Sequence, residues 1–316
     1  MNAPFFLDCD TGIDDAMAIG WLAATPGVDL VGVSTVSGNL DAAGGARNTL
    51  DLLAMMGRPD VPVSVGAHDF LDHAYSGGAP EVHGVNGIGE VTLPRAAAEP
   101  TGTSGAQAIV DAARAHPGEL NLLAIGPFTN IALALELEPR LPELVGRFTV
   151  MGGAAMAPGN VSELAEANVA NDPLAAHTVF TAGFDLTMIG LDVTMKHVFE
   201  ESHRQELLAV GTPVTTAIAQ MLEYYYAFYA QRYGRPCAVL HDPLAAAVAT
   251  GEVELAVAPT VPVVVDHTDG PGRGQTIADL RDVYQGFPTV YPGGTRVALE
   301  ISGDFAGTLL ERLSRL

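Results

Sequence analysis

Apolar stretches of two kinds alternate along the chain. Short runs rich in β-branched and aromatic residues predict strands, and longer runs rich in alanine and leucine predict helices. The predicted strands cover residues 5–9, 30–35, 61–65, 120–125, 148–151 and 186–191. The predicted helices cover residues 14–24, 42–56, 105–115, 130–137, 172–182 and 214–233.

This alternation predicts an α/β fold with an open, Rossmann-like, mainly parallel central sheet that is flanked by helices. No repeat, low-complexity tract or linker divides the sequence, so we expect a single domain over residues 1–316. Long loops inside a compact domain tend to be functional. Three such stretches interrupt the alternation, at residues 66–103, 152–170 and 266–275.

Composition narrows the possible partners and the compartment. The formal net charge of −22 argues against binding to nucleic acid or to an anionic membrane. No apolar run is long enough to span a membrane, and the N-terminus lacks the basic and apolar regions of a signal peptide. The two cysteines, Cys9 and Cys237, form no disulfide framework, so we expect reduced thiols and a cytoplasmic location.

Four aspartates lie between the first predicted strand and the first predicted helix: Asp8, Asp10, Asp14 and Asp15. Aspartates in a first turn can cap a helix, but capping uses one or two carboxylates rather than four. Because like charges at this spacing repel, we expect a hard divalent cation, Ca²⁺ or Mg²⁺, to hold them together. Ligands of parallel sheets bind at the carboxyl ends of strands, which is where this cluster lies.

A phosphatase is the alternative enzyme class for this cluster. An Asp-x-Asp pair after a first strand also opens haloacid-dehalogenase-type phosphatases, in which Asp8 would be the nucleophile. Those enzymes usually have glycine before threonine, whereas here Thr11 precedes Gly12. They also need a basic residue for the phosphoryl group, and Lys196 is the only lysine. The sequence therefore favours the metal site.

Polar residues follow several other predicted strands. Amides and carboxylates in the stretch from residue 160 to 168 suit sugar hydroxyls, although a solvated loop would have the same composition. Asn39 could bind a ligand or cap the next helix. The carbonyl of Ile125, at a strand end, could ligate a hard cation. His241-Asp242, ahead of an alanine-rich helix, could be a helix cap or a general acid beside a metal ligand.

Two further segments carry rings. Glycines around His83 suggest a mobile lid, or simply a flexible surface loop. Tyr225 and Tyr229 are four residues apart and share one helix face, which could stack on a base or belong to the core.

Together these segments resemble the nucleoside hydrolase family, the inosine–uridine-preferring N-ribohydrolases. The resemblance runs from Asp8 to about Asp279, and the opening Asp-x-Asp-x-Gly-x-Asp-Asp is highly specific for that family. Further matching segments are Ser37-Gly38-Asn39, Gly126-Pro127-Phe128-Thr129-Asn130, Met151-Gly152-Gly153, Pro158-Gly159-Asn160, Ala165-Glu166-Ala167-Asn168, His241-Asp242-Pro243 and Arg273-Gly274-Gln275-Thr276.

The resemblance implies Ca²⁺-dependent hydrolysis of the N-glycosidic bond of a ribonucleoside to ribose and free base. The ion would be held by the carboxylates of Asp10, Asp15 and Asp242 and by the main-chain carbonyl of Ile125. The family often has threonine at this last position, but a main-chain ligand tolerates isoleucine. Asp10 would also act as general base on a metal-bound water, with inversion at the anomeric carbon.

The resemblance also assigns the substrate contacts. His241 would protonate the departing base, Tyr225 and Tyr229 would shape that side of the site, and His83 would close over the base from the lid. Ribose would be bound by a set of polar residues and one methionine: Asp14, Asn39, Met151, Asn160, Glu166 and Asn168.

Two differences from the family pattern narrow the base preference that we expect. Asn86 replaces an aspartate that the family often has in the lid. Purine-specific members sandwich the base between tryptophans, and this chain has only Trp21. We therefore expect a broad or inosine–uridine-preferring enzyme, with a pyrimidine-preferring one as the alternative. A nucleoside-binding protein without turnover is disfavoured, because Asp10 and His241 are both present. The family forms dimers or tetramers, so we expect a homo-oligomer, such as a homotetramer.

Overall fold

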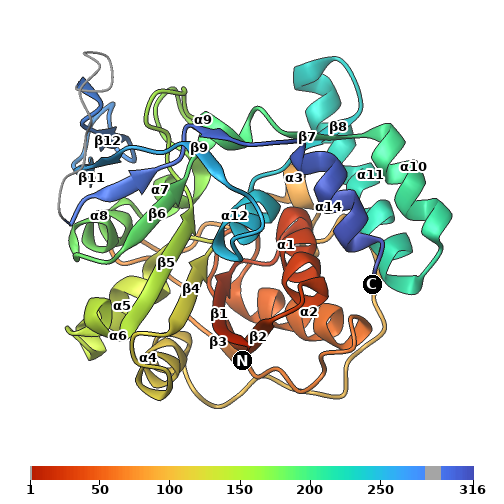
Figure 1. Ribbon diagram of the computed structural model, residues 1–316, viewed down its shortest axis with the longest axis horizontal. Coiled ribbons are helices and arrows are strands. Elements are labelled where there is room, and N and C mark those ends of the chain that lie inside the picture. Colours follow the sequence, from red (N-terminus) through yellow and green to blue (C-terminus); the bar gives the residue numbers. More distant parts are fainter. Residues whose placement is uncertain (1, 282–292) are drawn as a thin grey trace.

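The computed structural model describes residues 2–281 and 293–316, which build a central sheet flanked by helices (Figure 1). The sheet has eight strands in the order β10-β13-β6-β5-β4-β1-β2-β3. All neighbouring pairs are parallel except β10 and β13. Its strands are β1 (Ala3–Cys9), β2 (Val28–Thr35), β3 (Val63–Val65), β4 (Leu120–Ala124), β5 (Val145–Met151), β6 (Leu186–Ile189), β10 (Thr260–Val261) and β13 (Thr295–Val297).

Helices and short strand pairs complete the described part of the chain. The helices are α1 (Ile13–Ala24), α2 (Ala42–Met55), α3 (Pro80–His83), α4 (Gly105–Ala115), α5 (Thr129–Leu137), α6 (Leu141–Leu144), α7 (Ala167–Asn171), α8 (Pro173–Thr181), α9 (Leu191–Thr194), α10 (Glu201–Val210), α11 (Pro213–Tyr233), α12 (Asp242–Ala249) and α14 (Phe305–Leu313). The strand pairs are β7 (Val198–Glu200) with β8 (Cys237–Val239), β9 (Leu255–Val257) with β14 (Glu300–Ile301), and β11 (Val263–Val265) with β12 (Thr276–Ala278).

The sheet is buried on both faces. Successive side chains of a strand point to opposite faces, so neighbouring residues of one strand pack into different apolar clusters. In β1, Phe5 and Leu7 belong to one apolar cluster, which includes residues of α1, α2, α11, α12 and α14. Phe6 belongs to a second cluster, which includes residues of α4, α5 and α8. This two-sided burial explains why the central strands appear in the sequence as continuous apolar runs.

The predicted fold class is confirmed, and each of the six predicted strands and six predicted helices has a counterpart. The predicted strand at residues 186–191 ends at Ile189, because Gly190 is already the N-cap of α9. The sequence pattern did not predict β10 and β13, which lie at one side of the sheet, or the helices α10 and α14. None of the helices that the structure describes is both long and apolar enough to cross a membrane.

The parallel register brings the carboxyl ends of four strands together. Cys9 of β1 pairs with Thr35 of β2, and Asp8 pairs with Ala124 of β4. Ala124 in turn pairs with Val150 of β5. The segments that follow β1, β2, β4 and β5 therefore emerge side by side, and they carry most of the residues singled out in the sequence.

Candidate active site

The turn between β1 and α1 is fixed by Asp15. The amide of Asp10 donates a hydrogen bond to Oδ1 of Asp15 at 3.2 Å, and the amide of Gly12 donates to Oδ2 at 2.7 Å. Asp15 is the third residue of α1, where a carboxylate can accept from backbone amides before the first helical turn. The acidic run therefore forms one rigid turn rather than a flexible acidic loop.

The loop after β2 joins this turn through Asn39. Its amide donates to Oδ2 of Asp10 at 2.7 Å, and its side-chain Nδ2 donates to Oδ2 of Asp15 at 3.3 Å. Oδ1 of Asp10 is buried and has no hydrogen-bond partner among the described residues. A buried carboxylate oxygen without a partner is costly, which points to a ligand at that atom.

Asp242, the first residue of α12, adds a carboxylate from a distant part of the chain. Oxygens of Asp14, Asp15 and Asp242 all lie within 4.8 Å of one another, and all three side chains are buried. Asp10 is not part of this group of three, but the charges of Asp15 and Asp14 act on it. The predicted ligand Ile125 lies beside the group at the same pocket, and its carbonyl accepts a hydrogen bond from Asn168 at 2.9 Å.

Burial makes these carboxylates difficult to ionise in the absence of a cation. Burial, together with the charge of the neighbouring Asp15, raises the pKa of Asp14 to about 8. Burial likewise raises the pKa of Asp10, Asp15 and Asp242. Since a carbonyl oxygen has two lone pairs, Ile125 can accept from Asn168 and still face a cation. The unpartnered Asp10 oxygen and this all-oxygen donor set fit a hard divalent cation.

Glu166 and its neighbours form a second wall. Glu166 is the N-cap of α7, where Oε1 accepts from the amide of Asn168 at 2.9 Å and Oε2 accepts from the amide of Gly153 at 2.9 Å. Nδ2 of Asn168 also donates to the carbonyl of Met151 at 3.1 Å, and Oδ1 of Asn160 accepts from the backbone at 3.0 Å. The structure thus brings together the amides and the carboxylate predicted to bind sugar hydroxyls.

His241 and its partners form the opposite wall. Its Nε2 lies 3.1 Å from the hydroxyl of Tyr229, and its Nδ1 lies 2.9 Å from Oγ1 of Thr194. Burial lowers the pKa of His241 to about 4, so the ring is neutral at pH 7. The rings of Tyr225 and Tyr229 meet edge to face with centroids 4.9 Å apart.

His83 ends α3 and is buried rather than carried on an exposed lid. Its Nδ1 accepts a hydrogen bond from the amide of Ile13 at 3.1 Å, and its ring lies 5.4 Å from that of Tyr225. Burial and the nearby His241 lower the pKa of His83 to about 3. Asn86 closes the following turn, because its Oδ1 accepts from the backbone at residues 88 and 90.

A pocket of about 560 Å³ lies between these walls. Twelve of the predicted site residues line it: Asp14, Asn39, His83, Ile125, Met151, Asn160, Glu166, Asn168, Tyr225, Tyr229, His241 and Asp242. Asp10 and Asp15 do not line it, but they are buried, at 2% and 0% exposure, and both accept hydrogen bonds from the lining residue Asn39. Asp8 does not line the pocket and is fully buried, with Oδ1 accepting from Ser34 and Asn130. Asp8, the nucleophile of the phosphatase alternative, is therefore tied to Ser34 and Asn130, whereas Asp10 is tied to the lining residue Asn39.

The sequence reading missed several residues of the pocket. Phe228, Arg232 and Tyr233 line it beside Tyr225 and Tyr229. Their spacing of three and four residues along α11 was a signal that they share that face. Thr194 gave no comparable signal, because only the fold brings α9 next to His241.

Carboxylates, amides, imidazoles and tyrosine rings line this one pocket on an α/β scaffold, and such a set of groups suits a sugar joined to a planar base. The chain belongs to the inosine-uridine preferring nucleoside hydrolase family, whose family model matches residues 5–305. It is therefore a nucleoside hydrolase by family, as the sequence resemblance predicted.

Relatives and solved structures agree with this assignment. A probable uridine nucleosidase 2 from Arabidopsis thaliana is 35% identical over 271 residues, which cover 85% of this chain and 81% of that protein. A pyrimidine-specific ribonucleoside hydrolase RihA from Salmonella arizonae is 35% identical, covering 77% of this chain and 78% of its own length. A purine-preferring ribonucleoside hydrolase from Gardnerella vaginalis superimposes with a TM-score of 0.88 at 30% identity, covering 99% of this chain and 97% of that one. A plant nucleoside hydrolase gives 0.89 at 28% identity, covering 99% and 98%.

Proposed function

We propose that this enzyme hydrolyses the N-glycosidic bond of ribonucleosides in a Ca²⁺-dependent reaction, with Asp10 as general base and His241 as leaving-group acid. One observation carries the proposal: a cluster of buried carboxylates, with the unpartnered Oδ1 of Asp10, adjoins a pocket that His241 and Tyr229 also line. The pocket volume of about 560 Å³ accommodates a nucleoside.

The proposed metal ligands are Asp10, Asp15, Asp242 and the carbonyl of Ile125. A bound Ca²⁺ would lower the pKa of an adjacent water and take two ribose hydroxyls as further ligands. Asp10 is well suited to receive the proton of the attacking water, because Asn39 fixes only its Oδ2 and leaves Oδ1 available.

Ribose is held by groups that can accept from or donate to its hydroxyls: Asp14, Asn39, Asn160, Glu166 and Asn168, beside the apolar Met151. Glu166 already accepts three backbone amides, so its position is fixed before substrate arrives. Fixed acceptors that strengthen their contacts as the ribose ring becomes positive favour the oxocarbenium-like transition state. Attack by water in a single displacement gives inversion at the anomeric carbon.

At the base end, negative charge develops on the departing base as the bond breaks. Burial lowers the pKa of His241 to about 4 in the free protein, so an acid role requires the ring to take up a proton before it passes one to the departing base. Its contacts with Tyr229 and Thr194 orient the ring, and the hydroxyl of Tyr229 can share the proton that leaves with the base. His83 and Tyr225 line the pocket with ring centroids 5.4 Å apart, and we assign both rings to contacts with the base.

Uridine is the substrate we favour first, within a broad or inosine–uridine-preferring range. Relatives named as uridine nucleosidases and as pyrimidine-specific ribonucleoside hydrolases support this preference. The same names support a strictly pyrimidine-preferring enzyme as the second candidate. The ratio of uridine to inosine turnover separates the two.

The test is ribose release from uridine and inosine, measured side by side before and after Ca²⁺ is stripped with a chelator. We expect activity that disappears with the chelator and returns with Ca²⁺. No ribose release from any common nucleoside by the Ca²⁺-loaded protein would overturn the proposed reaction, and activity that survives chelation would overturn the metal dependence.

We further expect a homo-oligomer, such as a dimer or homotetramer, in the cytoplasm. Light scattering coupled to size-exclusion chromatography measures the first. Fractionation of the source cells measures the second.

A further inference from the structure

The segment Arg273-Gly274-Gln275-Thr276 supports one wall of the pocket from behind. We call residues 152–166, between β5 and α7, the ribose-side loop. Gln275 pairs with Ala165 of this loop in an antiparallel bridge. Gly274 has φ +84°, and a Cβ atom there would lie 2.9 Å from Cβ of Ala165. The segment therefore packs directly against the residue that precedes Glu166.

Thr276 extends this support to the other end of the loop. A Cβ atom on Gly153 would lie 2.6 Å from Oγ1 of Thr276, so the Gly153 backbone packs closely against the Thr276 side chain. The amide of Gly153 is one of the donors to Glu166. Both ends of the ribose-side loop thus touch the segment at residues 273–276.

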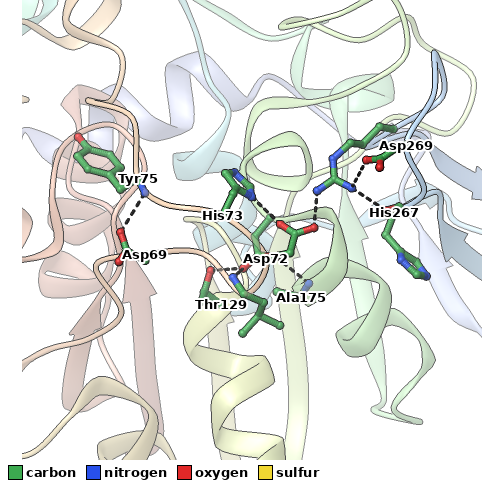
Figure 2. A network of polar contacts seen from close by, with 11 residues as sticks. Asp69, Asp72, His73, Tyr75, Thr129, Ala175, His267 and Asp269 are labelled. Carbon is green, nitrogen blue, oxygen red and sulfur yellow. Dashed lines mark hydrogen bonds and ion pairs between the residues drawn. The ribbon is translucent and has the colours of Figure 1, made fainter.

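Arg273 connects this segment to a loop on the other side of the pocket. We call residues 66–79, between β3 and α3, the lid-side loop. Nη2 of Arg273 donates to Oδ2 of Asp72 of that loop at 2.5 Å. Figure 2 shows Asp72 within this network, beside His73. Nη1 donates to the carbonyl of His267 at 2.6 Å, and the other Asp72 oxygen lies 2.5 Å from Nδ1 of His73. Both terminal nitrogens of the Arg273 guanidinium are therefore held by hydrogen bonds.

The lid-side loop leads straight into the pocket. The amide of Leu71 donates to Asp172, the N-cap of α8, at 2.9 Å. At the other end of the loop, the amide of Ala79 donates to the carbonyl of Asn39 at 3.0 Å. Directly after it, α3 carries His83. A shift of the loop at residue 72 would therefore reach both Asn39 and His83.

We propose that Arg273 is a positioning residue that, through its ion pair with Asp72, fixes the lid-side and ribose-side loops relative to each other. The inference deepens the proposed function, since it concerns how that pocket keeps its shape for a ribonucleoside. Residues 72 and 273 come from distant parts of the chain, and the two loops lead to different lining residues of the pocket, His83 after the lid-side loop and Glu166 in the ribose-side loop.

The ion pair between Arg273 and Asp72 is suited to positioning the two loops rather than to stabilising the fold. The side chains of Arg273 and Asp72 are 29% and 32% exposed, and ion pairs of that exposure add little to the free energy of unfolding. A planar guanidinium that makes several fixed hydrogen bonds does restrict the distance and angle between its partners. Loss of the pair should therefore change substrate binding more than folding.

The experiment compares steady-state kinetics on uridine for Arg273→Gln, Asp72→Asn, the double variant and Arg273→Lys. Arg114→Gln is the matched control, because Arg114 also joins two elements through Glu138, at 2.6 Å, and lines neither loop. We expect each single loss of the pair to raise KM about 3- to 10-fold while kcat changes less than about twofold. The rise in KM of the double variant should be no larger than that of either single variant. The KM of Arg273→Lys should lie between those of the wild type and Arg273→Gln.

Hydrogen–deuterium exchange tests the same proposal without relying on turnover. In Arg273→Gln and Asp72→Asn, amides of residues 66–79 and 152–166 should exchange faster, while those of α4 keep their wild-type rates. Unchanged KM, additive losses, or the same rise in KM with Arg114→Gln would overturn the proposal. So would unchanged exchange in both loops. A wild-type protein that releases no ribose would overturn the proposed function alone, and exchange would then decide whether the pair holds the loops.

Discussion

The two oxygens of Asp10 are in different situations. Asn39 donates to Oδ2, while Oδ1 has no partner among the described residues. Asp10→Ala should lower kcat by about 10²- to 10⁴-fold, because loss of a general base typically has this effect. Ribose release measures the rate, and far-UV circular dichroism confirms the fold. Asp60→Ala, at an exposed aspartate, is the control, and a near-normal rate for Asp10→Ala would remove Asp10 from the mechanism.

Among the described residues, the two nitrogens of His241 contact hydroxyl groups alone, those of Tyr229 and Thr194. If it protonates the leaving base, its importance depends on how poor that leaving group is. His241→Ala should therefore reduce kcat/KM for inosine far more than for nitrophenyl riboside, which needs no protonation. The two substrates are measured on the same preparation. Equal losses on both would contradict an acid role.

At the scale of elements, the loop after β2 approaches the β1–α1 turn so closely that only glycine fits at position 38. A Cβ atom there would lie 2.0 Å from Oδ2 of Asp10 and 2.8 Å from Cδ of Pro127. Gly38→Ala should displace the Asp10 carboxylate and lower kcat by about 10-fold or more, with less effect on the melting temperature. Gly102→Ala is the matched control, because a Cβ atom there meets nothing within 4 Å. Equal activity of the two variants would show that the loop yields without moving Asp10.

The sequence predicted those elements whose buried residues form a recognisable apolar pattern over neighbouring positions. The central strands are apolar on both faces, and α1, α2 and α11 are long enough to show their composition. In contrast, β10 and β13 have only two and three residues, and α10 buries only Leu207. None of these three elements produces a recognisable apolar pattern in the sequence. The site residues came from motif resemblance, whereas Thr194 and the partner of Arg273 depend on contacts between distant segments.

At the scale of the whole molecule, the cluster of buried carboxylates links stability to the cation. Ca²⁺ should raise the melting temperature by roughly 5 °C at about 100 times its Kd, because binding to the folded state alone contributes about 2.7 kcal/mol. Differential scanning fluorimetry with and without chelator measures the shift. Mg²⁺ at equal concentration should give a smaller one, since it requires stricter octahedral geometry. Identical melting curves with and without Ca²⁺ would contradict a calcium site.

The packing of α12 against the β1–α1 turn has a consequence for synthesis on the ribosome. Asp10, Asp14 and Asp15 are translated before Asp242, which lies 227 residues beyond Asp15. At about 5 to 20 residues per second, roughly 10 to 50 s separate the two events. Throughout that interval the acidic turn can remain hydrated, because the helix that helps to bury it does not yet exist. The nascent chain thus avoids enclosing uncompensated negative charge until the last contributor to the site is present.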